Sequence, residues 1–285
     1  MRHNDIFNAT YSTGSDPLED PRVALKEGYI LLWGNLSSSN AETMARRAKK
    51  FAYELVRENV AGVLYQPLEF FAEADRFNRE IVSVFDAADI PVVLLDYDIE
   101  PPPGRSKYDI VGVNNTDAGY RMCCHLIEAG AERICFVLRP NTSPSWYNRM
   151  RGVVTATNLR GGGKSISYEI LKAKPDDLAA IKRHWRKFRP DAFVCGGDVS
   201  AAILRKTLEK LFLRIPEDVM LAGFGNLQIS GLLSPSLTTI DLPSEKIGET
   251  AFRRLIERIA APELEPTEIS LPAPLVVRDS TKGRS

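Results

Sequence analysis

The sequence predicts an α/β protein built on doubly wound, mostly parallel β-sheets. Short apolar runs alternate with amphipathic segments along most of the chain, which is the pattern of repeated βαβ units. The runs are rich in β-branched residues and are bounded by polar or turn residues, as buried parallel strands are. The chain has 285 residues, 44% of them apolar, and a chain of about this length usually forms two lobes or domains.

Seven runs are expected to form the strands of these sheets. They span Tyr29–Trp33, Gly62–Tyr65, Pro91–Leu95, Asp109–Val113, Ile134–Leu138, Ala192–Cys195 and Val219–Ala222. The opening of the chain breaks the pattern, because residues 5–21 contain two prolines and no apolar run that suits a central strand. We therefore expect residues 1–27 to be irregular, with Val23–Glu27 at most the last turn of a helix.

Five segments with apolar residues at three- and four-residue spacing are expected to form helices that cover the strands. They span Ala41–Asn59, Glu73–Ala88, Ala118–Gly130, Asp176–Phe188 and Ser200–Phe212. Asn40 and Asn115 stand where helix N-caps are expected, and Gly130 stands where a helix ends. A further helix is expected to open at Arg149, and another to include Phe252–Ile259.

Composition and charge exclude several classes of protein. The 37 Lys and Arg residues balance the 37 Asp and Glu residues, whereas a module that binds duplex nucleic acid normally has a basic excess that displaces counterions. No stretch approaches the roughly 20 apolar residues of a membrane-spanning helix, so no membrane partner is expected. Residues 1–11 lack the apolar core of a signal peptide, so we expect a cytoplasmic protein.

No set of residues for catalysis or metal binding stands out. A nucleophile with a base, paired carboxylates and a His/Cys/carboxylate cluster are all missing, so no catalytic residue, metal or cofactor is expected. Residues 161–164, three glycines and a lysine, differ from a phosphate loop because they follow a helix rather than a strand. His125 and His184 lie within expected helices. The four cysteines lie in apolar runs and are expected to be buried free thiols, namely Cys123, Cys124, Cys135 and Cys195.

The residues that remain suit the binding of a small molecule. Asp96 and Tyr97 follow one apolar strand, Trp146 lies in the loop after another, Arg149 opens a helix and Asp198 follows a third strand. Carboxylates accept and an arginine donates paired hydrogen bonds, while aromatic rings stack on the C–H faces of sugars. These residues therefore indicate a polyhydroxylated ligand at the ends of the strands.

Gly196, Gly197 and Asp198 join an expected strand to an expected helix. One interpretation is a binding turn whose backbone N–H groups face a ligand, as at many strand ends of doubly wound sheets. The other is a simple tight turn with Asp198 as the N-cap of the helix. The two interpretations are compatible, and the sequence leaves both open.

The order of several motifs points to a known family. The motifs are Val111–Tyr120, His125–Gly130, Glu132–Ile134, Arg149–Gly152, Pro190–Asp198, Leu213–Val219, Gly223–Phe224, Leu233–Ile240, Pro243, Gly248–Ala251 and Leu275–Thr281. With these motifs the chain from Gly28 to Thr281 resembles the effector-binding core of the LacI/GalR (lactose-repressor) family, whose fold is similar to that of periplasmic sugar-binding proteins.

This resemblance implies a periplasmic-binding-protein-like fold of two lobes, each with a doubly wound, mostly parallel sheet, joined by three crossovers. We expect residues 1–132 and 241–262 to form the N-terminal lobe, and residues 133–240 and 263–285 to form the C-terminal lobe. The resemblance further implies a ligand in the cleft between the lobes and a homodimer of two copies.

The resemblance also assigns roles to individual residues. Asp96 corresponds to the strand-end carboxylate of the family, and Arg149 corresponds to its effector-clamping arginine. Gly197 and Asp198 correspond to the turn before a helix at the cleft.

One position departs from the family pattern. The family usually has an aspartate directly after a glycine–aromatic pair, yet here Gly225 and Asn226 follow Phe224. Asn226 is expected to supply a neutral hydrogen-bonding substitute.

The sequence thus predicts the ligand-sensing core of a LacI-type transcriptional regulator that binds a small polar metabolite, either a sugar or a nucleoside-like compound. Residues 1–27 do not match the helix-turn-helix and hinge helix that the family places before this core, so DNA contact is expected only through a module missing from this chain. The alternative is a stand-alone solute-binding protein for a transporter, which needs an export signal. An enzyme that uses the same cleft is a third hypothesis, and it lacks a catalytic set.

Overall fold

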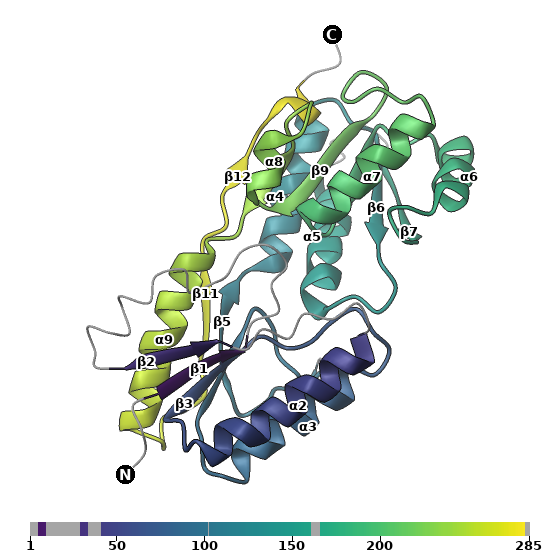
Figure 1. The fold of residues 1–285 in the computed structure, drawn as a ribbon. Coiled ribbons are helices and arrows are strands. Elements are labelled where there is room, and N and C mark those ends of the chain that lie inside the picture. Colours follow the sequence, from purple (N-terminus) through teal and green to yellow (C-terminus); the bar gives the residue numbers. More distant parts are fainter. Residues whose placement is uncertain (1–4, 10–28, 34–40, 102, 161–165, 283–285) are drawn as a thin grey trace. The chain divides into compact units, whose positions relative to one another are not determined.

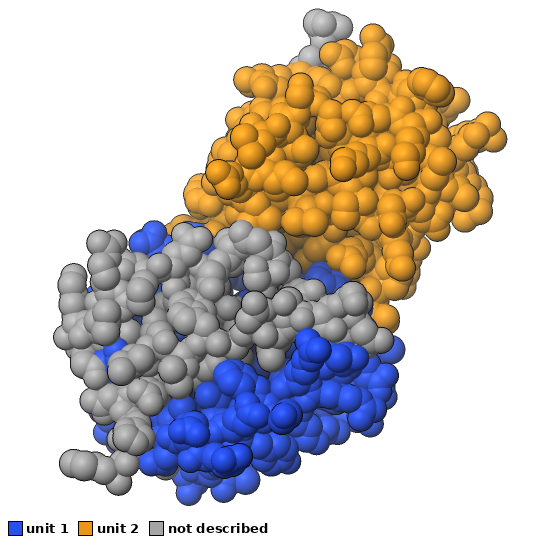
Figure 2. All heavy atoms as spheres, in the orientation of Figure 1, with its two compact units in different colours: residues 1–113, 243–271 blue, residues 114–242, 272–285 orange. Residues whose placement is uncertain are grey.

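The computed structural model describes residues 5–9, 29–33, 41–101, 103–160 and 166–282. The chain divides into two compact units (Figures 1 and 2). Unit 1 consists of residues 1–113 and 243–271, and unit 2 of residues 114–242 and 272–285. The chain therefore passes between the units three times, as the resemblance implies for the fold.

The unit boundaries differ from the expected lobe boundaries by two residues at 241–242, which belong to unit 2, and by more at two longer segments. Residues 114–132 belong to unit 2, because α4 (Asn115–Glu128) packs against α5 (Pro144–Arg160). Residues 263–271 belong to unit 1, because β11 (Glu268–Leu271) pairs with β5 (Asp109–Val113). Pairing and packing partners that lie far apart in the sequence decide both assignments.

Unit 1 has a six-stranded parallel sheet in the order β11-β5-β4-β3-β1-β2. Its other strands are β1 (Asp5–Ala9), β2 (Ile30–Trp33), β3 (Gly62–Tyr65) and β4 (Val92–Leu95). The expectation of an irregular opening is wrong for β1, which pairs in parallel with both β2 and β3. Backbone pairing with two neighbouring strands holds this five-residue segment in the sheet, and both neighbours come later in the chain. The local sequence pattern therefore does not reveal it. The helical turn expected at Val23–Glu27 lies outside the described residues.

Helices cover both faces of the unit 1 sheet. On one face lie α2 (Ala41–Arg57) and α3 (Ala74–Asp86), and on the other lies α9 (Ser244–Ala260) (Figure 1). Because side chains alternate along a strand, Val63 and Tyr65 pack in the cluster of α2 and α3, while Leu64 packs in the cluster of α9. Both clusters are apolar, as expected for a doubly wound sheet.

A buried carboxylate ties α9 to the sheet of unit 1. Asp109, at the start of β5, accepts hydrogen bonds from Arg254 Nε (2.9 Å), Arg258 Nε (3.0 Å) and the Thr267 N–H (2.8 Å). Burial acts to raise the pKa of Asp109, but the hydrogen bonds from Arg258, Thr267 and Arg254 outweigh it and hold the pKa below its ordinary value. The ionised form of Asp109 therefore stabilises unit 1.

Unit 2 also has a six-stranded sheet, in the order β12-β10-β9-β8-β6-β7, in which only β12 is antiparallel. The strands are β6 (Arg133–Leu138), β7 (Ser167–Lys172), β8 (Ala192–Cys195), β9 (Met220–Gly225), β10 (Thr238–Asp241) and β12 (Leu275–Val276). Besides α4 and α5, its helices are α6 (Leu178–Phe188), α7 (Asp198–Lys210), α8 (Gln228–Leu232) and the 3-10 turn Asp279–Thr281.

Several expected details of unit 2 are confirmed and one is corrected. Gly130 follows α4 with a φ of 96°, as a terminating glycine does. The N-cap of α4 is Asn114 rather than Asn115, and its side chain accepts from the Asp117 N–H. All four cysteines are free thiols, three of them buried and Cys124 half-buried. None of the helices in the described part of the chain is both long and apolar enough to cross a bilayer.

We predict that Asp109→Asn lowers the free energy of unfolding by about 3–5 kcal/mol at neutral pH. Removing one partner of a buried ion pair leaves the others buried and uncompensated. Urea denaturation of the full chain measures the loss. Asp117→Asn is the control, because Asp117 forms an exposed pair with Arg121 and its loss costs at most about 1 kcal/mol.

The pH dependence of this difference has a definite sign. Because the pKa of Asp109 is lower in the folded state, its contribution is complete above the unfolded value of about 3.9 and is lost as the pH falls through the folded value. The gap between the wild type and Asp109→Asn should therefore be constant from pH 7 to pH 5 and shrink below about pH 4. A gap that widens on acidification contradicts this assignment.

Candidate functional site

The carboxyl edge of the unit 2 sheet is the strongest candidate for a functional site. The strand order reverses there, because β7 lies on one side of β6 and β8 lies on the other. In open α/β sheets, ligands bind outside the carboxyl ends of the strands at such a switch point. Five of the seven sequence-predicted site residues follow the strands of this sheet, namely Trp146, Arg149, Gly197, Asp198 and Asn226.

Arg149 joins three elements at this edge. Its buried guanidinium donates from Nε to Asn115 Oδ1 of α4 (2.7 Å) and from Nη1 to the Gly196 carbonyl after β8 (2.6 Å). The same group lies over the ring of Phe224 on β9, 5.2 Å from its centre. A cation held over a ring and by two oxygen atoms is fixed in position.

Close contact between α4 and α5 places Arg149. A Cβ added at Gly119 would collide with the Arg149 backbone oxygen, and one added at Gly152 would collide with the Thr116 oxygen. The two helix backbones therefore touch, and only glycine fits at these two positions. This backbone contact explains why a glycine, Gly152, stands three residues after Arg149.

Trp146 lies in the first turn of α5, which begins at Pro144, so its expected position in a loop is wrong. The indole lies against the turn after β8. A Cβ at Gly196 would fall among the Cγ, Cδ2 and Cε3 atoms of the ring, and one at Gly197 would lie 3.3 Å from Cζ2. The two glycines thus make room for the indole.

Asp198 does not cap α7. The N-cap is Gly197, and Asp198 is the first residue of the helix. The residue is 1% exposed, and its carboxylate accepts hydrogen bonds from Thr239 Oγ1 (2.7 Å) and the Leu227 N–H (2.9 Å). Burial raises the pKa of Asp198, although these hydrogen bonds act in the opposite direction. The side chain therefore connects α7 to β10 and to the loop after β9.

Asn226 uses both ends of its amide inside unit 2. Its Nδ2 donates to Asp241 Oδ1 (3.2 Å), and its Oδ1 accepts from Arg278 Nη2 (2.6 Å). Arg278 also donates to Ser230 Oγ and to the Leu237 carbonyl. This network fixes the loop between β9 and α8.

Sequence reasoning missed two hydroxyl groups in the loop between β6 and α5. Thr142 Oγ1 and Ser143 Oγ are buried and have no hydrogen-bond partner among the described residues. Buried polar groups normally have partners, so these two require an explanation such as a ligand or water. The signal was present in the sequence, because a stretch rich in proline and hydroxyl residues follows an apolar strand there.

Asp96 and Tyr97 follow β4 and belong to unit 1, whereas the other five site residues belong to unit 2. The Tyr97 hydroxyl donates to the Pro67 carbonyl (3.0 Å), and burial raises the pKa of this hydroxyl well above its ordinary value. Asp96 is half-buried with a φ of 71°. A Cβ at Gly112 would lie 2.9 Å from Asp96 Cα, so that glycine accommodates the turn.

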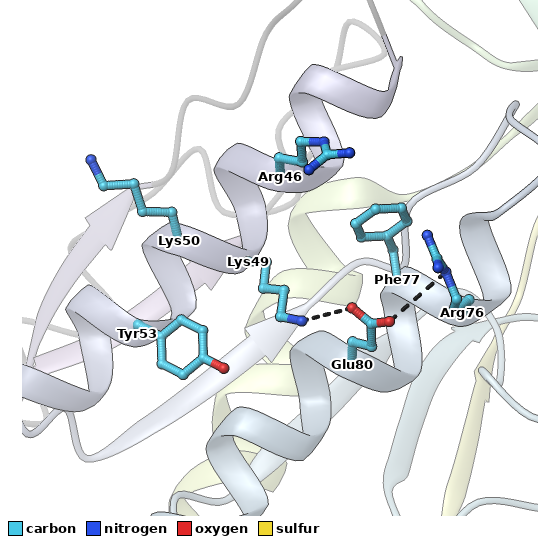
Figure 3. Close-up of a pocket in the computed structure, with 7 residues that line it drawn as sticks. All are labelled: Arg46, Lys49, Lys50, Tyr53, Arg76, Phe77 and Glu80. Carbon is cyan, nitrogen blue, oxygen red and sulfur yellow. Dashed lines mark hydrogen bonds and ion pairs between the residues drawn. The ribbon is translucent and has the colours of Figure 1, made fainter.

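A second candidate is a groove of about 490 Å³ between α2 and α3 (Figure 3). It is lined by Arg46, Lys49, Lys50, Tyr53, Arg76, Phe77 and Glu80. Lys49 Nζ lies 2.7 Å from Glu80, and Arg76 also faces this carboxylate. The groove lies between two covering helices and its cations have carboxylate partners on the same helices, so the unit 2 edge remains the stronger candidate. The described residues contain no group of three or more His, Cys, Asp or Glu side chains placed to hold a metal ion.

We predict that Gly152→Ala destabilises unit 2 and displaces Arg149, because the new methyl group would force α4 and α5 apart. The midpoint of thermal unfolding should fall by several degrees, consistent with the cost of about 1–3 kcal/mol for overpacking. Gly231→Ala is the matched control, since a Cβ there meets nothing within 4 Å. Equal midpoints for the two variants would contradict the helix contact.

Comparisons with known proteins add to this geometry. Residues 124–281 match the family model described as periplasmic binding protein-like domain. The HTH-type transcriptional repressor PurR of Vibrio vulnificus is 28% identical over 260 residues, which cover 90% of this chain and 73% of the repressor.

Solved structures show the same fold at lower identity. The transcription regulator CcpA of Lactococcus lactis has a TM-score of 0.78 at 17% identity and covers 99% of this chain and 100% of its own. A LacI family regulator from Enterococcus faecium with bound ribose has a TM-score of 0.73 at 20% identity, with 97% of this chain and 98% of that chain covered.

Proposed function

Since the chain belongs to the periplasmic binding protein-like domain family, as an effector-binding core of the LacI/GalR type, we propose that it senses a small polar metabolite at the carboxyl edge of unit 2. The observation that carries this proposal is the pair of unpartnered buried hydroxyls, Thr142 and Ser143, in the loop that leads into α5, the helix of the fixed cation Arg149. The ligand class is a sugar or a nucleoside-like compound.

The comparisons favour a regulator over a transporter component, because the curated relatives are transcriptional repressors. We further propose binding without catalysis, location in the cytoplasm and DNA contact through a module outside this chain. A ligand changes such a regulator only if it binds two states of the protein with different affinity. We propose Asp96 and Tyr97 as the ligand-binding residues of unit 1.

Thermal melts with panels of sugars and nucleosides test the sensing role. A ligand at one hundred times its Kd should stabilise the wild type by about 2.7 kcal/mol. Ser143→Ala should leave the unliganded midpoint unchanged, because the hydroxyl has no partner to lose among the described residues, and should weaken ligand binding about two- to tenfold.

Ser83→Ala is the control for this variant, because Ser83 is exposed on α3 and bonds only locally to the Glu80 carbonyl. A wild type that responds to no compound in either panel would refute the sensing proposal. Unchanged affinity in Ser143→Ala would remove this hydroxyl from the site.

We also propose a homodimer through the neighbouring helices α7 and α8 of unit 2. Val199 and Ile203 lie one turn apart on α7, and Ile229 and Leu232 lie almost one turn apart on α8. These four apolar side chains are between 38% and 77% exposed. An apolar patch that spans two packed helices typically marks a protein interface, and we propose a second copy of this chain as its partner because the resemblance implies a homodimer.

Ile203→Glu should convert the dimer to a monomer without lowering the unfolding midpoint, since the charge is buried only at the interface. Sedimentation velocity measures the oligomeric state. Phe212→Ser is the control, because Phe212 is 92% exposed and lies just after α7, outside the patch. A monomeric wild type would refute the dimer, and a dimeric Ile203→Glu variant would refute this surface.

A further inference from the structure

We propose that Asp198 is the positioning residue of the dimer surface, because its carboxylate holds the short helix α8 against α7 in the arrangement that the second copy contacts. This inference rests on the proposed homodimer through the apolar patch of α7 and α8. Three observations carry it. They are the dependence of α8 on other elements, the two hydrogen bonds of one carboxylate, and the shape of β9 around that carboxylate.

The first observation is that α8 cannot fix its own position. It has five residues, Gln228–Leu232, whereas an isolated helix of fewer than about 12 residues is marginal in water. Its N-cap, Leu227, forms no side-chain capping bond, and neither its first nor its last turn carries a charge that favours the helix dipole. The position of α8 therefore depends on bonds from other elements.

The helix α7, in contrast, is fixed by its own apolar face. Ala201, Leu204 and Leu208 belong to the core cluster of unit 2 and are fully buried. Val199 and Ile203 of the patch lie on the same helix and are partly exposed. The half of the patch on α7 is thus held by the core, while the half on α8 needs a link to α7.

The second observation is that one carboxylate supplies this link. Asp198 is the first residue of α7, and its Oδ2 accepts from the N–H of Leu227, the N-cap of α8 (2.9 Å). Its Oδ1 accepts from Thr239 Oγ1 on β10 (2.7 Å), which orients the carboxylate. The two helices also pack against each other (Figure 1). The carboxylate therefore joins the starts of both patch helices to the sheet.

The third observation is that β9 is shaped around this carboxylate. A Cβ added at Gly223 would collide with Asp198 Oδ1, and one added at Gly225 would contact Oδ2 at 3.5 Å. The strand thus has no side chain at the two positions nearest to the buried group. Because interiors are closely packed, the carboxylate has little freedom to choose other partners. The link between α7 and α8 is therefore rigid.

The place of this link matters for the patch. Val199 directly follows Asp198, and Ile229 is two residues after Leu227, so the hydrogen bond lies next to both halves of the patch. The core of a stable interface needs close shape complementarity. A displaced α8 would present Ile229 and Leu232 out of position for the second copy. Loss of the carboxylate should therefore weaken association of the two copies.

Sedimentation equilibrium of the full chain measures the dimer dissociation constant. We expect Asp198→Ala to raise this constant about tenfold or more, because the Leu227 N–H loses its acceptor. Asp198→Asn should restore most of the affinity, since an amide can accept from Leu227 and donate to Thr239 Oγ1. Thr239→Val should give a smaller increase, because the carboxylate keeps its bond to Leu227.

Asp109→Asn is the matched control for a general loss of stability. Asp109 and Asp198 are both buried carboxylates with 1% exposure. The hydrogen-bond partners of Asp109 all belong to unit 1, namely Arg254, Arg258 and Thr267. This variant should lower the unfolding midpoint and leave the dimer dissociation constant unchanged. The unfolding midpoint of every variant shows whether it is folded at the temperature of the measurement.

Several results would overturn the inference. If a folded Asp198→Ala variant keeps the wild-type constant while Ile203→Glu is monomeric, the dimer surface stands and the positioning role is refuted. If Asp109→Asn weakens the dimer as much as Asp198→Ala does, the effect is one of stability alone and the role is also refuted. If Asp198→Ala does not fold, Thr239→Val decides, and an unchanged constant then refutes the role. A monomeric wild type removes the proposed dimer and this inference together.

Discussion

The candidate site depends on the position of one buried guanidinium, that of Arg149. It receives its place from the backbone contact of α4 with α5, which two glycines permit, and it then binds Asn115 and the Gly196 carbonyl. The turn after β8 is thereby fixed relative to both helices, and the indole of Trp146 lies on that turn. Because the cation has defined oxygen partners and a ring beneath it, its burial costs less than that of an isolated charge.

Most of the fold follows from the sequence because buried parallel strands and covering helices have strong local patterns. The seven expected strands are all present, with small shifts at their ends. Five strands of the described residues were missed, namely β1, β7, β10, β11 and β12. Two of them show why. β1 has only two central apolar residues, and β7 lies at the sheet edge with every second side chain exposed. Their positions come from pairing with distant segments, which local pattern does not contain.

The roles of the residues at the candidate site were harder to predict than the fold. Strand ends and glycine turns pointed to Trp146, Arg149 and the residues after β8. The sequence did not reveal that Asp198 and Asn226 form their hydrogen bonds with other residues of unit 2. Their partners Thr239 and Arg278 lie some forty to fifty residues away in the sequence. Long-range contacts decide whether a polar group faces a ligand or the protein itself.

The interleaved course of the chain has a consequence for synthesis in the cell. Neither unit is one continuous stretch, because unit 1 ends with residues 243–271 and unit 2 with residues 272–285. Most of both sheets is therefore synthesised before α9 and β11. Asp109 has no ion-pair partner from α9 until Arg254 and Arg258 have been made. During that time the growing chain carries an open strand edge and uncovered apolar surface, which are the features that chaperones protect. Unit 1 cannot reach its final form before residues 243–271 are made, nor unit 2 before residues 272–285.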